Sequence, residues 1–81
     1  MLKQIIILGP LKSKIKEAVH CTLPVEVNQE AVLQTMIDLF PAYERDIASC
    51  RVAIDHQFID SQMRSITDKS EIALIPPVSG G

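Results

Sequence analysis

Prolines and very small residues gather at the end of the chain, which reads Pro76-Pro77-Val78-Ser79-Gly80-Gly81. Consecutive prolines have a fixed φ and no N–H, so they cannot extend a sheet ladder and they favour an extended path. Glycine and serine at the tip let the backbone pass through a narrow channel. The pattern predicts a stiff arm with a slender end.

The group that this arm presents is the carboxylate of Gly81. A carboxylate is a poor electrophile, but adenylation turns it into a mixed anhydride that a sulfur nucleophile can attack to give a thiocarboxylate. An activating active site can enclose the tip only if its flanks are small, as Gly80 and Ser79 are. The alternative is a frayed terminus, because glycine and serine are common at disordered ends. The prolines and the preceding predicted strand favour the functional interpretation.

The cysteines and histidines form no recognisable reactive set. Neighbours on a strand point to opposite faces, so His20 and Cys21 are not expected to act as a pair. Together with Cys50 and His56 they do not match a zinc-ligand spacing, and we expect Cys50 to be partly exposed and His56 to lie in a surface turn. The chain also has no glycine-rich phosphate loop. We therefore expect neither a metal nor a nucleotide to be bound by this chain alone.

Composition narrows the class of protein. The chain has 81 residues, 47% of them hydrophobic, and a formal net charge of −2. This is a single small folded domain without the basic excess of nucleic-acid-binding proteins. Lys12, Lys14 and Lys16 are most simply a solvated face. The apolar segment at the start of the chain is too short to span a membrane, and two cysteines make no disulfide framework. We therefore expect a cytoplasmic protein without a membrane partner, and the charge balance argues against a nucleic-acid partner.

The first element expected is a strand over residues 2–8, because it is rich in β-branched residues. Ile5 and Ile7 point to one face, and Ile6 and Leu8 point to the other, so both faces are apolar and need cover. A helix of this domain can cover one face. A second protein is a candidate for the other.

The next segments alternate between helical and extended patterns. Pro10 can open a helix in which Leu11, Ile15 and Val19 recur every fourth residue, although a longer turn with one helical loop is the alternative. Residues 21–27 then alternate apolar and polar side chains, and Pro24 places this half-buried strand at a sheet edge.

The main helix is expected over residues 30–40, with Asn28 as its N-cap and Pro41 as its stop. Its apolar stripe comprises Val32, Leu33, Met36, Ile37, Leu39 and Phe40. Residues 42–49 add a short helical turn with Tyr43 and Ile47 inward.

Short strands are expected over 51–54, 57–59 and 71–75, with a turn at Asp55 and His56 and a polar loop over 60–70. One principal helix between early and late strands predicts an α+β fold in which a mixed sheet packs on that helix, the ubiquitin-like β-grasp. We expect residues 1–75 to form the domain and residues 76–81 a flexible tail.

The ending Glu71-Ile72-Ala73-Leu74-Ile75-Pro76-Pro77-Val78-Ser79-Gly80-Gly81 resembles that of the MoaD-type sulfur carriers, the small subunits of molybdopterin synthase within the ubiquitin-like ThiS/MoaD family. Weaker agreement covers the apolar first strand, the helix at 30–40 and the run 52–55. The family often has a glycine-rich turn before its last strand, and here that turn reads Asp68-Lys69-Ser70, without glycine.

The resemblance implies a mechanism and two partners. An adenylyltransferase similar to the ubiquitin-activating enzymes would activate Gly81 with ATP and magnesium, and sulfur would then be delivered to it. The carrier, once loaded with sulfur, would join the large synthase subunit in a heterotetramer and pass its sulfur to cyclic pyranopterin monophosphate. Gly81 would carry the sulfur, Gly80 would keep the tip slender, and Pro76, Pro77, Val78 and Ser79 would line the inserted arm.

A docking surface is also expected on the body. Ile75 and Phe58, together with Leu8, are candidates for an exposed apolar patch, the alternative being that they are core residues. Alternation favours Ile75 as exposed, since Ile72 and Leu74 should face the helix. Rival functions remain: a sulfur carrier for thiamine synthesis or tRNA thiolation, or a ubiquitin-like interaction module without sulfur chemistry.

Overall fold

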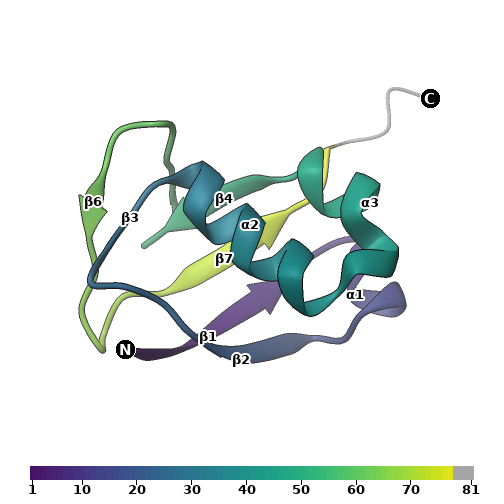
Figure 1. Ribbon diagram of the computed structural model, residues 1–81, viewed down its shortest axis with the longest axis horizontal. Coiled ribbons are helices and arrows are strands. Elements are labelled where there is room, and N and C mark those ends of the chain that lie inside the picture. Colours follow the sequence, from purple (N-terminus) through teal and green to yellow (C-terminus); the bar gives the residue numbers. More distant parts are fainter. Residues whose placement is uncertain (78–81) are drawn as a thin grey trace.

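A computed structural model describes residues 1–77 of the chain. Its centre is a five-stranded sheet in the order β2-β1-β7-β4-β5 (Figure 1). The strands are β1 (Leu2–Ile7), β2 (Ala18–Thr22), β4 (Arg51–Ile54), β5 (Gln57–Phe58) and β7 (Ile72–Ile75). The first and last strands of the sequence therefore lie side by side in the middle of the sheet, where they pair in parallel.

Strand β1 has two different faces, as the sequence predicts. Ile5 and Ile7 are fully buried in the core, whereas Ile6 and Leu8 are 39% and 42% exposed on the opposite face. Because side chains alternate along a strand, the same parallel pairing gives β7 a matching pattern, with Ile72 and Leu74 buried and Ile75 only half-buried. The sheet thus has an inner face toward the helices and an apolar outer face.

The expected helix after Pro10 is short. It forms only the single turn α1 (Leu11–Lys14), so the alternative of a turn with one helical loop is correct. Val19, placed on the helix by its spacing, lies instead in β2 opposite Ile5. The reason is tertiary: antiparallel pairing with β1 satisfies the backbone from Ala18 onward and buries Val19 against the same core.

The prediction of one continuous strand over residues 21–27 is wrong. Strand β2 ends at Thr22, and after Pro24, which has no N–H to donate, the chain resumes as β3 (Glu26–Val27). Strand β3 pairs with β6 (Arg64–Ser65), a strand inside the segment predicted to be loop. Strand β2 is an edge strand of the main sheet, and Pro24, on which the edge prediction rested, lies between β2 and β3 rather than in either strand.

Helix α2 (Gln29–Leu39) confirms the predicted main helix and its cap. The Oδ1 atom of Asn28 accepts a hydrogen bond from the Ala31 N–H at 2.9 Å. Val32, Leu33 and Met36 are buried, whereas Leu39 in the last turn is 49% exposed. A 3₁₀ turn, η1 (Pro41–Tyr43), and helix α3 (Glu44–Ala48) follow, with Ile47 fully buried as expected.

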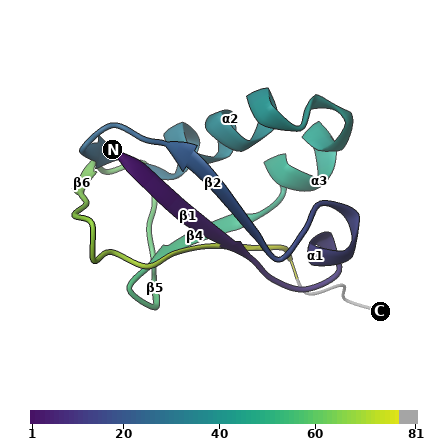
Figure 2. The same cartoon turned by 90° about the horizontal axis from the view of Figure 1, so that it is seen from below.

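The hairpin of β4 and β5 turns at Asp55 and His56, as predicted. Both residues have positive φ, 52° and 68°, which is the conformation that two-residue hairpin turns require. An aspartate adopts that conformation more readily than most residues. The turn lies on the side of the sheet away from α2 (Figure 2).

The layers match the predicted β-grasp. Helices α2 and α3 lie over the inner face of the sheet, and within residues 1–77 no helix covers its outer face (Figures 1 and 2). The core between the layers is built mainly from Ile, Leu and Val, among them Ile5, Val32, Val52 and Leu74, with Met36 packed among them. None of the helices in this part of the chain is long and apolar enough to cross a bilayer.

Candidate functional site: the outer face of the sheet and the root of the tail

An apolar groove of about 350 Å³ runs over the outer face of the sheet. It is formed where β1, β7, β4 and β5 present the side chains that alternate away from the core. Its side-chain lining includes Ile6, Leu8, Ala53, Phe58, Ala73 and Ile75, with His56 and Glu71 at its polar end. The two small alanines at neighbouring central positions leave the hollow between the larger side chains.

The three residues predicted to form a docking patch meet in this groove. Phe58 is 56% exposed and lies opposite Ala53 in the β4–β5 register, so its ring stands on the outer face. Leu8 and Ile75 come from the ends of the two central parallel strands. The structure thus brings together Leu8, Phe58 and Ile75, and their role in binding a partner remains a proposal.

Polar and ionisable side chains lie at the rim of the groove. His56 Nε2 lies 3.4 Å from Glu71 Oε2, and the Glu71 N–H donates to Asp55 Oδ1 at 2.9 Å. The guanidinium carbon of Arg51 lies 4.6 Å from the centroid of the Phe58 ring. Both His56 and Glu71 are exposed, so their pair adds little to stability. The sequence interpretation missed Arg51 and Glu71, because only the sheet register places them beside the groove.

The tail leaves the body next to the start of α1. Because β1 and β7 are parallel, their ends emerge at the same edge, and the Leu8 N–H donates to the Leu74 carbonyl at 3.1 Å. A small cleft of about 180 Å³ lies at this edge, lined by Pro10, Leu11, Lys14, Asp46, Ser49, Pro76 and Pro77. Pro76 is half-buried and Pro77 is exposed. The predicted tip, Val78 to Gly81, lies outside the described residues.

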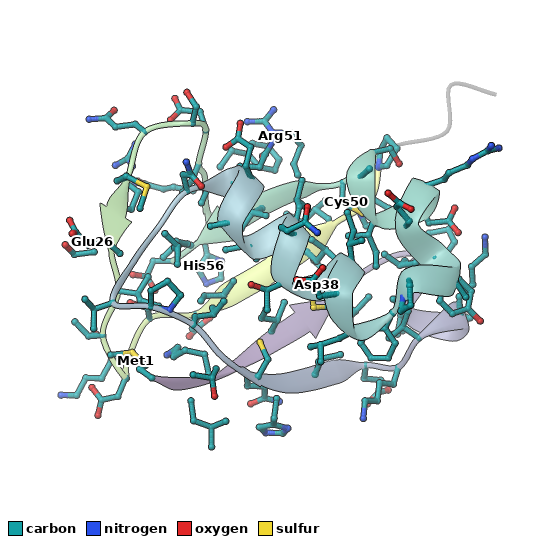
Figure 3. The ribbon with its side chains drawn as sticks, in the orientation of Figure 1. Met1, Glu26, Asp38, Cys50, Arg51 and His56 are labelled. Atoms are coloured by element: carbon teal, nitrogen blue, oxygen red, sulfur yellow. The ribbon has the colours of Figure 1, made fainter. Side chains whose placement is uncertain are left out.

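Neither cysteine is placed for nucleophilic chemistry. Cys50, which follows α3 and directly precedes β4 (Figure 3), is only 2% exposed, so the expectation that it is partly exposed is wrong. Burial, and secondarily the negative charge of Asp46, raises the pKa of the Cys50 thiol to about 11. Burial also raises the pKa of Cys21. Thiols with raised pKa values remain protonated and unreactive near neutral pH.

His20 and Cys21 do not interact as a catalytic pair. They follow one another on β2, with His20 exposed and Cys21 buried, as strand alternation predicts. Within residues 1–77, no three or more His, Cys, Asp or Glu side chains gather into a set that could hold a metal ion.

Comparison with known proteins agrees with this geometry. The model of the ThiS family matches residues 5–81. A search of curated protein sequences finds no match. Two solved structures superpose over their full length and over all of this chain: SAMP1 from Haloferax volcanii, with a TM-score of 0.76 and 19% identity, and a chain of the complex of subunits 1 and 2 of molybdopterin-converting factor from Helicobacter pylori 26695, with a TM-score of 0.70 and 21% identity.

At identities this low, the structural likeness establishes a common fold. The family match is stronger evidence, because it begins within β1 and continues through β7 and the tail to Gly81. The match covers the main helix, the tail after β7 and all strands of the sheet except the first three residues of β1. The chain therefore belongs to the ThiS family and is a ubiquitin-like sulfur carrier of the ThiS/MoaD type.

Proposed function

We propose that this chain is the sulfur-carrying small subunit of molybdopterin synthase and that it works in the cytoplasm. The observation that carries the proposal is the run from Glu71 to Gly81, in which the central strand β7 passes directly into Pro76 and Pro77. The prolines make a stiff arm, and the small residues after them make a tip that an enclosed active site can accept.

Two chemical steps would load the tip. In the first, a carboxylate oxygen of Gly81 attacks the α-phosphorus of ATP, and pyrophosphate leaves with the electron pair of the broken P–O bond. In the second, hydrosulfide from a sulfur donor attacks the acyl carbon, AMP leaves with the electron pair of the broken C–O bond, and loss of the S–H proton gives the thiocarboxylate. A partner adenylyltransferase would hold the ATP and its magnesium, because this chain contains no glycine-rich phosphate loop.

The outer groove would dock the enzymes that use the tip. Exposed apolar patches on small domains commonly mark interaction sites, and this one lies on the same central strand that continues into the arm. A partner bound over Leu8, Phe58 and Ile75 would therefore hold the arm close to its own active site. The complex of two molybdopterin-converting factor subunits, one of them similar in fold to this chain, supports a large subunit as that partner.

Intact mass measurement tests the carrier chemistry. The protein is incubated with the adenylyltransferase from the same organism, ATP, magnesium and a sulfur donor. Replacement of one oxygen by sulfur at Gly81 adds about 16 Da. A chain that gains no mass with an activator proven on another carrier would instead be an interaction module without sulfur chemistry.

A second function, sulfur supply for thiamine synthesis, is favoured by the family model that matches the chain. The two pathways differ in the enzyme that receives the sulfur. Binding of the tagged carrier to the molybdopterin synthase large subunit, compared with binding to a thiazole synthase and to a tRNA-thiolating enzyme, separates them. Preferential binding to either of the latter two would contradict the molybdopterin assignment and leave the carrier chemistry intact.

A further inference from the structure

Gly9 and Pro76 meet where the two central strands end. Gly9 follows β1 and Leu8, whereas Pro76 follows β7 directly, so the parallel pairing brings them to the same edge. Gly9 has a φ of +65°, and its carbonyl accepts a hydrogen bond from the Lys12 N–H at 3.1 Å, which turns the chain into α1. Glycine adopts this conformation without steric cost.

The Pro76 ring occupies the space that a side chain at position 9 would fill. A Cβ built on Gly9 would lie 2.8 Å from Pro76 Cγ and 3.5 Å from Pro76 Cδ. Carbon atoms pack at about 3.5–4.0 Å, so the first of these contacts is a clash. The Pro76 ring can therefore pack against the backbone at position 9 only because Gly9 has no side chain.

The other walls of the cleft come from the two short helices. Pro10, Leu11 and Lys14 contribute from the α1 side. Asp46 and Ser49 contribute from the α3 side, and Lys14 Nζ lies 3.3 Å from Asp46 Oδ2 as an exposed ion pair. Because the proline ring fixes its own φ, seating it also constrains the direction in which the backbone continues.

We infer that Gly9 is a positioning residue for the sulfur-carrier reaction. By leaving room for the Pro76 ring to pack against it, Gly9 sets the direction in which the arm, which begins at Pro76, leaves the body relative to the outer groove. This inference rests on the proposed function. The partner holds the body at the groove and needs the tip in its active site, so a misdirected arm lowers the rate of activation without weakening docking. A small misplacement of a reacting group costs a large factor in rate.

The test is a cycle of Gly9→Ala and Pro76→Ala variants, assayed for ATP-dependent loading of sulfur by the adenylyltransferase. In Gly9→Ala, kcat should fall roughly ten- to hundredfold, while KM for the carrier stays near the wild-type value because the groove is untouched. In the Pro76→Ala background the ring atoms that clash are gone, so adding Gly9→Ala should change kcat little. Thermal unfolding of all four proteins measures the strain of alanine at positive φ, which is the same in both backgrounds.

The outcomes separate the two claims. Equal kcat for Gly9→Ala and the wild type, or an equal loss in both backgrounds, overturns the positioning role. A rise in KM alone also overturns it, because that places the effect on docking. A wild-type chain that gains no sulfur contradicts the proposed function instead. An NMR cross-peak between the Gly9 Hα and Pro76 Hγ protons checks the contact independently of any activity, and its absence contradicts the inference.

Discussion

The ammonium group of Lys3 donates a hydrogen bond to the backbone carbonyl of Ser70 at 2.7 Å, across 67 positions of sequence. It also donates to the carbonyls of Thr67 and Asp68, at 2.9 and 3.1 Å. Lys3 is 6% exposed, so all three protons of a nearly buried charge are used. These bonds connect strand β1 to the loop that leads into β7, at the turn Asp68-Lys69-Ser70, which contains no glycine.

Replacing this lysine should therefore destabilise the domain. Lys3→Met keeps most of the apolar stem but leaves three carbonyls without their donor, and we expect a loss of roughly 2–4 kcal/mol in the free energy of unfolding. Urea unfolding measures it. The control is Lys12→Met at an exposed lysine of α1, which should change stability by less than about 0.5 kcal/mol. Equal effects of the two substitutions would mean that the Lys3 bonds contribute nothing.

Substitution in the outer groove should weaken partner binding and leave the fold intact. Phe58→Ala removes the most exposed large apolar side chain of the groove. If that ring is a binding hot spot, Kd for the large subunit should rise roughly thirtyfold or more. Titration calorimetry measures it. Leu39→Ala is a matched control, since Leu39 is similarly exposed but lies on α2, over the opposite face of the sheet. Equal Kd values for both variants would move the docking site elsewhere.

Alkaline pH should destabilise the protein in part through Cys50. Its pKa is raised from 9.0 to about 11 by burial and by Asp46, so the unfolded chain loses the thiol proton first. The stabilisation from the protonated thiol is complete below about pH 9 and is lost progressively as pH rises toward about 11, for a total of roughly 2–3 kcal/mol.

The contribution of the Cys50 thiol is isolated by comparing the free energies of unfolding of the wild type and Cys50→Ala between neutral and alkaline pH. The other titrating groups are the same in the two proteins, so their contributions cancel. The variant should show the shallower decline. Parallel declines would show that the folded and unfolded thiols have the same pKa.

With the native protein at neutral pH, a thiol reagent should label Cys50 only after unfolding.

Removal of Gly81 should abolish sulfur loading without unfolding the domain. The core residues nearest the tail lie in β7, where Leu74 is fully buried, so the body does not depend on the tip. We expect an unchanged melting temperature and no gain of mass with the activator. Ser79→Ala, which keeps the tip small, should load normally. A lower melting temperature on deletion would instead assign the tip a structural role.

The main elements could be predicted because their signals are local. Asn28 and Pro41 bound the main helix, alternation along β1 and β7 divides inner from outer residues, and the turn at Asp55 and His56 sits between two short strands. The ending from Glu71 onward carries its own pattern, which the family model also covers. Capping, chain stiffness and strand alternation act over a few residues, so the sequence determines them directly.

The remaining strand assignments and the contacts of the candidate site depend on pairing between segments that are distant in sequence. Val19 matches a helical spacing, yet it lies in a strand because β1 offers it backbone partners, and the loop over 60–70 contains β6 because β3 does the same. The three bonds of Lys3 and the contact between Pro76 and Gly9 follow from placing the two ends of the chain side by side. The gathering of Leu8, Phe58 and Ile75 into one groove also needs the pairing of β4 with β7 and β5. Such contacts depend on register between residues far apart in sequence, and only the folded sheet sets that register.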